Sequence, residues 1–295
     1  MPLPERKKGE LSVLSAMAIG SFFPIVTVLS YAAVPSLISL GWSTLIAALF
    51  FGAVVAYRKK WKELAQPLLW KYVALVTLFI SILYYGFYYI GLTYTLPGNA
   101  AIIALFEVFT SFLFFNVFRG ERISWDYKIG ALLMVIGALI VLGKDFSHIN
   151  VGDLLILAAT VSAPIGNLFQ QKARNIASSE TILFLRGMLA VPAIFFFAFV
   201  FGQHASLGNI QEAALFLVIN GVIILGISKV LWIEAIHRIS VTKAMALQSF
   251  GPLATLFFAW LILHQAPNIW QLASVVPLIL GVLFLTDHLK LSRYR

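Results

Sequence analysis

The sequence has no cysteine and few charged residues, and both shortages restrict what kind of protein it can be. Without cysteine there is no disulfide framework, no thiol nucleophile and no thiolate-bound metal. Charged residues make up 11% of the 295 residues, whereas hydrophobic residues make up 61% and the mean hydropathy is +0.93. Water-soluble domains carry far more charge. The composition therefore predicts an all-α integral membrane protein whose helices lie in a lipid bilayer.

The motifs of common enzymes and pumps are missing as well. No HExxH, GxSxG or Walker sequence occurs, and the five histidines are scattered along the chain. Such motifs supply metal ligands, nucleophiles or phosphate-binding loops. We therefore expect that the protein is not an enzyme, that it uses no metal or other cofactor, and that this chain does not pump by hydrolysing ATP.

The positive charge lies in short segments between apolar stretches. The formal net charge is +9, and 18 of the 21 lysines and arginines fall at the two ends or at alternate connections, while the opposite connections hold only Lys144. This is the pattern of membrane topology, so no nucleic-acid partner is expected. Because cytoplasmic connections are rich in lysine and arginine, we expect a multi-pass protein of the cell (cytoplasmic) membrane with both termini in the cytoplasm.

Apolar stretches of membrane-spanning length recur along the chain. A helix needs about 20 apolar residues to cross a bilayer core of ~30 Å. Suitable stretches lie at about residues 10–32, 35–57, 71–92, 97–118, 124–143, 151–171, 179–201, 212–236, 242–264 and 268–287. This pattern predicts ten transmembrane helices.

The two halves of the sequence resemble each other. GELSVLSA at residues 9–16 aligns with GDLLILAA at 152–159, an offset of 143, and Trp125 aligns with Trp270 at an offset of 145. Chance matches among apolar residues are the alternative, but tryptophan is an uncommon residue. Because five is an odd number, a second five-helix copy enters the bilayer from the opposite side, so the repeats are inverted. We expect a cytoplasmic leader at 1–8, a first repeat at 9–143, a second repeat at 152–287 and a cytoplasmic tail at 288–295.

Several motifs together carry a family resemblance. The GELSVL and GDLLIL openings, an alanine-rich fourth helix in each half, PLATLFFAW in the ninth helix and GALLMVIGALIVLG in the fifth resemble the EamA-like members of the drug/metabolite transporter superfamily. The resemblance covers residues 9–287. It implies a bundle of ten helices that moves small organic metabolites, often amino acids or their derivatives outward, through a central cavity. One departure stands out: the proline typical of each fourth helix is present as Pro252, but its counterpart is Glu107.

Glu107 is the leading candidate for a functional residue. It stands near the middle of the predicted helix 97–118, where a charge costs roughly 2.5–3.5 kcal/mol on insertion scales. Ala104 and Ser111 lie on its face of the helix, so this face is expected to line the bundle interior or a hydrated cavity. We hypothesise that Glu107 binds a proton or a substrate amine and changes its charge during transport. The alternative is a structural acid paired permanently with a neighbouring helix.

Two cations and a tryptophan also lie inside predicted spans. Lys229 is placed either to reach the membrane interface on its long stem or to meet a substrate carboxylate or Glu107. Trp232 shares its helix face and either stacks on substrate or belongs to the interfacial aromatic belt. Arg186 can grip a carboxylate through two hydrogen bonds, either on the substrate or on a structural acid such as Glu180, or it can reach the interface.

Polar and aromatic side chains near helix breaks complete the candidate list. Asn167 follows a Pro–Gly-containing stretch and Gln248 precedes another, and both suit either a polar cavity wall or interhelical hydrogen bonds. Tyr85 and Tyr88 share one face of the third helix, where their hydroxyls can line a cavity.

The sequence thus predicts a secondary active transporter. We expect it to export a small polar metabolite, such as an amino acid or derivative, by alternating access coupled to protons or to exchange. A flippase for a lipid-linked sugar is the alternative with the same fold. The next alternatives are a passive channel and, after it, a membrane-embedded enzyme or receptor. The expected partners are the substrate, protons and the bilayer, and the protein is either a monomer or a homodimer.

Overall fold

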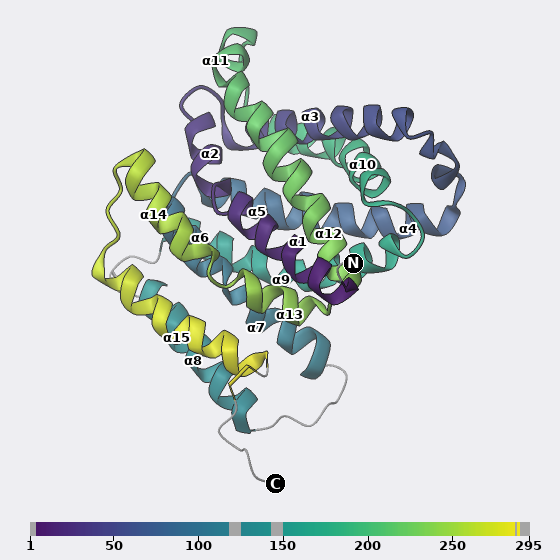
Figure 1. Ribbon diagram of the computed structural model, residues 1–295. Coiled ribbons are helices and arrows are strands. Elements are labelled where there is room, and N and C mark those ends of the chain that lie inside the picture. The colour runs from purple at the N-terminus through teal and green to yellow at the C-terminus, as the bar shows by residue number, and fades with distance from the viewer. Residues whose placement is uncertain (1–3, 118–124, 143–149, 287, 290–295) are drawn as a thin grey trace.

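The computed structural model describes residues 4–117, 125–142, 150–286 and 288–289, and every regular element in these ranges is a helix (Figure 1). The predicted outer cation Lys144 lies outside the described residues. The same holds for the first three residues of the predicted leader, the domain limits at 143 and 287, and the tail beyond 289.

The helices of the first half follow one another with few connecting residues. They are α1 (Glu5–Gly20), α2 (Phe23–Ser30), α3 (Ser36–Tyr57), the 3-10 helix η1 (Lys60–Ala65), α4 (Pro67–Val76), the π-helical η2 (Thr77–Tyr84), α5 (Tyr85–Gly91), α6 (Pro97–Ala104), α7 (Phe106–Phe112), the π-helical η3 (Leu113–Val117) and α8 (Trp125–Leu142).

The second half is built in the same way. It contains α9 (Val151–Arg174), α10 (Ser179–Val200), α11 (Leu207–Val218), the π-helical η5 (Ile219–Ile227), α12 (Ser228–Arg238), α13 (Val241–Gln248), α14 (Gly251–Leu263) and α15 (Ile269–Leu285).

Helices occupy each of the ten predicted ranges, and the all-helical class is confirmed. Within the described residues, seven helical stretches are long and apolar enough to cross a membrane: Glu5–Ser30, Ser36–Tyr57, Pro67–Gly91, Pro97–Phe115, Val151–Arg174, Ser179–Val200 and Leu207–Arg238. The apolar helices α14 and α15 are shorter. Ten membrane crossings therefore stay a prediction.

The helices of each half pack mainly against helices of the other half. The most extensive helix pairs, α3 with α10 and α8 with α15, each join one half to the other. The opening helix α1 packs on α12 of the second half, and the opening helix α9 packs on η2 and α5 of the first. The first helix of each half thus contacts the third membrane-length stretch of the other half, which is Pro67–Gly91 or Leu207–Arg238. Such an exchange of contacts is what two halves related by a two-fold axis are expected to show.

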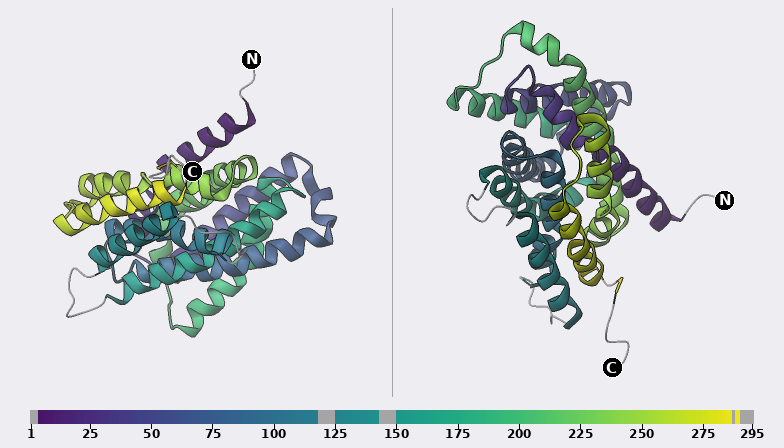
Figure 2. Two further views of the ribbon diagram at one scale, coloured as in Figure 1. Left: turned by 90° about the horizontal axis from the view of Figure 1, so that it is seen from below. Right: turned by 90° about the vertical axis from the view of Figure 1, so that its left-hand side faces the viewer.

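Glycine allows α8 and α15 to lie side by side (Figures 1 and 2). A Cβ added to Gly130 would lie 3.0 Å from the carbonyl oxygen of Gly281, and one added to Gly281 would lie 2.9 Å from the carbonyl oxygen of Gly130. These contacts leave no room for a side chain. Small residues let membrane helices approach closely and gain van der Waals contact, which replaces the hydrophobic effect inside a bilayer.

The fourth helical stretch of each half is broken at the same position. The Val108 N–H donates to the Leu105 carbonyl at 3.0 Å, and the Leu253 N–H donates to the Phe250 carbonyl at 3.2 Å, so each break has a tighter, 3-10-type turn. Pro252 accounts for the second break because it has no N–H to continue the ladder. The first break forms without a proline.

Candidate functional site

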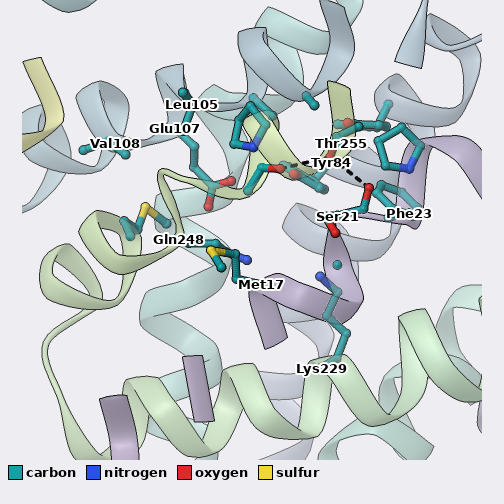
Figure 3. A pocket seen from close by; sticks show the side chains of 18 residues that line it. Met17, Ser21, Phe23, Tyr84, Leu105, Glu107, Val108, Lys229, Gln248 and Thr255 are labelled. Atoms are coloured by element: carbon teal, nitrogen blue, oxygen red, sulfur yellow. Dashed lines mark hydrogen bonds between the residues drawn. The ribbon is translucent and has the colours of Figure 1, made fainter. Parts of the chain in front are cut away.

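Two adjoining cavities lie among the broken helices. The larger has a volume of about 130 Å³ and the smaller about 70 Å³. Both are lined by Tyr84, Glu107, Lys229 and Gln248, which therefore form the partition between them. Since α7, α12 and α13 all contribute to this partition, side chains of both halves meet there (Figure 3).

All eight residues singled out from the sequence line these cavities. Glu107, Lys229 and Gln248 line both; Tyr88 lines the larger one; and Tyr85, Asn167, Arg186 and Trp232 line the smaller one. Their roles in binding or proton coupling stay a proposal.

Glu107 is placed by the break in the fourth helix. It is the second residue of α7, directly after the turn at Leu105, and it points into the larger cavity (Figure 3). The helix is fixed beside it, because the Thr110 hydroxyl donates to the Thr160 carbonyl of α9 at 2.7 Å. Its Oε1 atom accepts a hydrogen bond of 3.1 Å from Asn167 Nδ2. A carboxylate can accept several more, so Glu107 retains acceptor capacity toward the cavity.

Asn167 is the centre of a hydrogen-bonded chain that joins the four helices α7, α9, α10 and α12. Its Oδ1 atom accepts from Trp232 Nε1 at 3.0 Å and from Gln170 Nε2 at 3.2 Å. The Gln170 Oε1 atom in turn accepts from an Arg186 Nη1 at 3.4 Å. Glu107 and Arg186 are therefore the two ends of one polar chain. Trp232 takes part in it through its indole N–H, which the prediction of a stacking surface did not foresee.

Lys229 follows the π-helical segment η5 and is the second residue of α12. Its side chain reaches toward the larger cavity from the side opposite Glu107 (Figure 3). The ammonium lies 5.8 Å from the centre of the Tyr85 ring, within cation–π range. Over the described ranges, no ion pair of 4.0 Å or less joins Lys229 to Glu107. The predicted alternative of a direct Lys229–Glu107 pair is therefore not found.

Arg186 is buried, with 6% of its surface exposed. The structural acid considered for it, Glu180, pairs instead with Arg58 at 2.5 Å and Lys60 at 3.3 Å. The interpretation of Arg186 as a partner of Glu180 is therefore wrong, and its burial excludes an arginine that reaches the interface. Its guanidinium borders the smaller cavity and a further void of about 10 Å³ beside Tyr85.

Aromatic rings form one wall of the site. Tyr85 and Tyr88 are both 3% exposed and both pack on Phe23, with ring centres 5.8 and 5.0 Å apart. Tyr84 packs on both tyrosines and lines both cavities. Tyr84 is not among the residues that the sequence predicts for the site, although its spacing of four residues from Tyr88 places the two on one helix face.

Gln170 and Gln248 differ in how well their amides are satisfied. Gln170 is 2% exposed and links Arg186 to Asn167, a role that its sequence position did not reveal. Gln248 ends α13 and makes no hydrogen bond within the ranges that the structure describes, so its amide is available to the cavity. An amide can both donate and accept.

A second charged region lies at the beginning of α1 and the end of α12. Glu234 accepts from Arg174 at 2.6 Å and from the Ser179 hydroxyl at 2.5 Å, and it also pairs with Arg238. Arg238 pairs in addition with Glu5 of α1 at 3.0 Å. This ion-pair cluster (Arg174, Glu234, Arg238 and Glu5) joins α1, α9 and α12, and the Ser179 hydroxyl adds α10 to it.

Comparison with known proteins agrees with this architecture. The family model described as "EamA-like transporter family" matches twice, at residues 7–143 and 150–287. The Bacillus subtilis (strain 168) protein named "Uncharacterized transporter YoaV" is 23% identical over 269 residues, which cover 86% of this chain and 88% of that protein. "Uncharacterized transporter YcxC" of the same organism is 24% identical over 214 residues, covering 68% of each chain.

A solved structure shares the fold. It is described only as "Crystal structure of protein", and it matches with a TM-score of 0.71 at 20% identity over 98% of this chain and all of its own length. At this identity the likeness bears on the fold alone. The two matches of the family model, which together span most of the sequence, decide the assignment: the chain belongs to the EamA-like transporter family and is a multi-pass membrane transporter.

Proposed function

We propose that the protein is a secondary active transporter that exports a small polar metabolite, such as an amino acid or derivative. The observation that carries this proposal is the pair of adjoining cavities, which side chains of both halves line with one carboxylate, two cations and several amides. Charged side chains inside membrane helices are costly and mark substrate or ion pathways. Transporters built from two repeats bind their substrates between the repeats.

The cavity size favours a small substrate. Volumes of about 130 and 70 Å³ are room for several water molecules each, which suits a metabolite of about the size of an amino acid. A lipid-linked sugar would need a larger chamber that opens toward the lipid.

Alternating access is the mechanism that suits the packing of the two halves. The breaks at Leu105 and Phe250 and the π-helical segments η2 and η5 lie beside the cavities, where they can change the direction of a helix at little cost. The ion-pair cluster around Glu234 then holds one end of the transport path closed. We propose that this is the cytoplasmic end, because α1 begins there and both termini are expected on that side.

Proton coupling through Glu107 is the energy source we favour, with exchange as the second mode. Glu107 contacts both cavities and accepts from one described donor, so proton uptake on its free oxygen would change the charge of the partition. The substrate and the proton would then compete for one carboxylate. Such competition couples the outward flow of one to the inward flow of the other.

Counterflow in proteoliposomes tests this function. Purified protein would be reconstituted with unlabelled amino acids or related metabolites inside, and uptake of the labelled compound would be followed. The expected result is saturable counterflow for at least one metabolite, sensitive to Glu107→Gln and insensitive to Lys62→Gln, which changes an exposed lysine of η1. Absence of counterflow across a broad panel would contradict the proposal.

The cysteine-free sequence makes the proposed topology testable with the same protein. Single cysteines at Ser240, between α12 and α13, and at Gln203, between α10 and α11, would lie on opposite sides of the membrane. In intact cells an impermeant thiol reagent should label Q203C and spare S240C. The reverse pattern would contradict a cytoplasmic location of the termini.

A further inference from the structure

Arg186 is a buried cation with almost no partner. Its one hydrogen bond within the described residues is the 3.4 Å contact to Gln170, and no carboxylate lies within 4.0 Å. A guanidinium has five N–H donors and stays charged in proteins. Burying such a group without an acid is strongly unfavourable, so a partner that is not part of the chain is the simplest compensation. The guanidinium borders the smaller cavity, which is where that partner would lie.

The charges around the two cavities do not cancel. Among the described residues that line them, Glu107 is the one acid, and Lys229 and Arg186 are the two bases. The negative charge of Glu107 offsets the positive charge of Lys229, although these two described side chains form no ion pair. One positive charge, that of Arg186, therefore remains, and the cavities carry a second when Glu107 binds a proton.

We propose that the substrate is a small acidic amino acid, which carries two carboxylates, one ammonium group and a net charge of −1. This inference rests on the proposed transport function and names the substrate class of the same site. One carboxylate would bind Arg186, the second Lys229, and the ammonium Glu107, so that each charged group of the cavities gains a partner of opposite sign. Gln248 supplies a further free amide at the partition.

The arrangement of the polar chain supports this placement. Arg186 and Glu107 stand at opposite ends of the chain formed by Gln170 and Asn167, so a carboxylate and an ammonium on one molecule would be held apart in a fixed orientation. The rest of the larger cavity is lined by apolar side chains such as Phe23, Leu105 and Val108 and by the hydroxyls of Ser21 and Thr255. The charged groups of the substrate would therefore lie at the partition, beside Glu107 and Lys229, and at Arg186 in the smaller cavity.

Isosteric pairs of amino acids provide the test. Thermal stabilisation of the purified protein and counterflow in proteoliposomes would be measured with aspartate and glutamate, with their neutral amides asparagine and glutamine, and with succinate and glutarate, which lack the amine. We expect an acidic amino acid to bind at least about 10-fold more tightly than its amide, because a charge-assisted hydrogen bond is lost with the amide. The dicarboxylates without an amine should bind less tightly than the acidic amino acids.

Variants of Arg186 assign the preference to one side chain. Arg186→Gln should reduce the affinity for the acidic amino acid about 10- to 100-fold and abolish its preference over the amide, whereas Arg186→Lys should retain the preference. Lys62→Gln removes the same charge from an exposed site and should change neither. Without ligand, Arg186→Gln should raise the melting temperature by about 2–4 °C, because an unpaired buried charge is removed.

The outcomes separate this inference from the proposed function. Equal binding of glutamate and glutamine, tighter binding of a neutral or cationic amino acid, or tighter binding of the amine-free dicarboxylates would overturn the acidic amino acid as substrate while transport itself stands. A lower melting temperature of Arg186→Gln would show that the guanidinium stabilises the fold, which also overturns the inference. Absence of transport for any metabolite would instead contradict the proposed function.

Discussion

The ion-pair cluster around Glu234 and the cavities around Glu107 hold the same types of side chain in opposite situations. Glu234 has two arginines and a serine hydroxyl as partners, whereas Glu107 has one asparagine amide. Arg174 and Arg238 pair with acids, whereas Arg186 contacts a glutamine. Charges that neutralise each other stabilise the packing of helices. We propose that the charges left without a charged partner serve a ligand, because otherwise their burial would only destabilise the fold.

The largest expected effect concerns Glu107. Glu107→Gln keeps an oxygen for the Asn167 amide but removes the charge, so the helices should pack as before while proton and amine binding are lost. We expect transport to fall at least about 100-fold, a typical loss when a functional charge is removed. Initial rates of counterflow at several pH values measure this, with the melting temperature as a control. An unchanged rate with an unchanged pH dependence would contradict a role for Glu107.

The corresponding change in the ion-pair cluster should affect the fold instead. Glu234→Gln removes the charge that holds Arg174 and Arg238 together, and leaves two cations next to each other. We expect a loss of about 2 kcal/mol in stability, since the cluster is only partly exposed. Thermal unfolding in detergent measures the loss, and Glu212→Gln on α11 is the matched control. If stability is unchanged, the cluster is not what joins these helices.

A smaller effect is expected from the hydrogen bond that positions Asn167. Trp232→Phe retains an aromatic ring but removes the N–H that donates to Asn167 Oδ1. The Gln170 amide still donates to the same oxygen, so the loss should be about 1 kcal/mol, or roughly 5-fold in substrate affinity. Titration of the substrate by thermal shift measures the change. A loss as large as that of Glu107→Gln would mean that the tryptophan contacts the substrate directly.

The smallest effect belongs to Glu63, which lies between two predicted spans. Its carboxylate accepts from the backbone N–H and the hydroxyl of Ser178 at the start of α10, at 2.9 and 2.8 Å. Burial raises the pKa of Glu63, but hydrogen bonds from Thr181 and Ser178 and the charge of Lys60 outweigh burial and hold the pKa below its ordinary value of 4.5.

A lowered pKa in the folded state means that the ionised form of Glu63 stabilises the fold. This contribution is present above the ordinary pKa and is lost as the pH falls below it. Glu63→Gln should therefore lower the melting temperature slightly at neutral pH, by about 1–2 °C, with the difference shrinking toward about pH 3. A difference that grows as the pH falls would contradict the assignment.

Much of the fold could be predicted from the sequence, because it depends on the length and period of apolar stretches. The ten helical ranges follow from hydropathy, and the repeat follows from motifs such as the two tryptophans at positions 125 and 270. The break at Leu105 could not be predicted, since no proline or glycine marks it. The π-helical segments η2 and η5 also leave no signal in the composition.

The candidate site was predictable in its members but not in their pairing. Glu107, Lys229 and Arg186 stand out because charge is rare inside predicted spans. Which acid meets which base depends on the packing of helices far apart in the sequence. Glu180 was therefore considered for Arg186 although it pairs with Arg58, and Gln170 was not recognised as the link between Arg186 and Asn167.

The most direct test of the contrast between the two regions is the ligand-free melting temperature of Arg186→Gln and Glu234→Gln, measured beside the unaltered protein. Both variants replace one charged side chain by glutamine. If the cavity charge is reserved for a substrate and the cluster charge holds the helices, the first variant melts at a higher temperature and the second at a lower one. A fall in both would contradict the account, because the guanidinium of Arg186 would then stabilise the fold itself in the absence of a ligand.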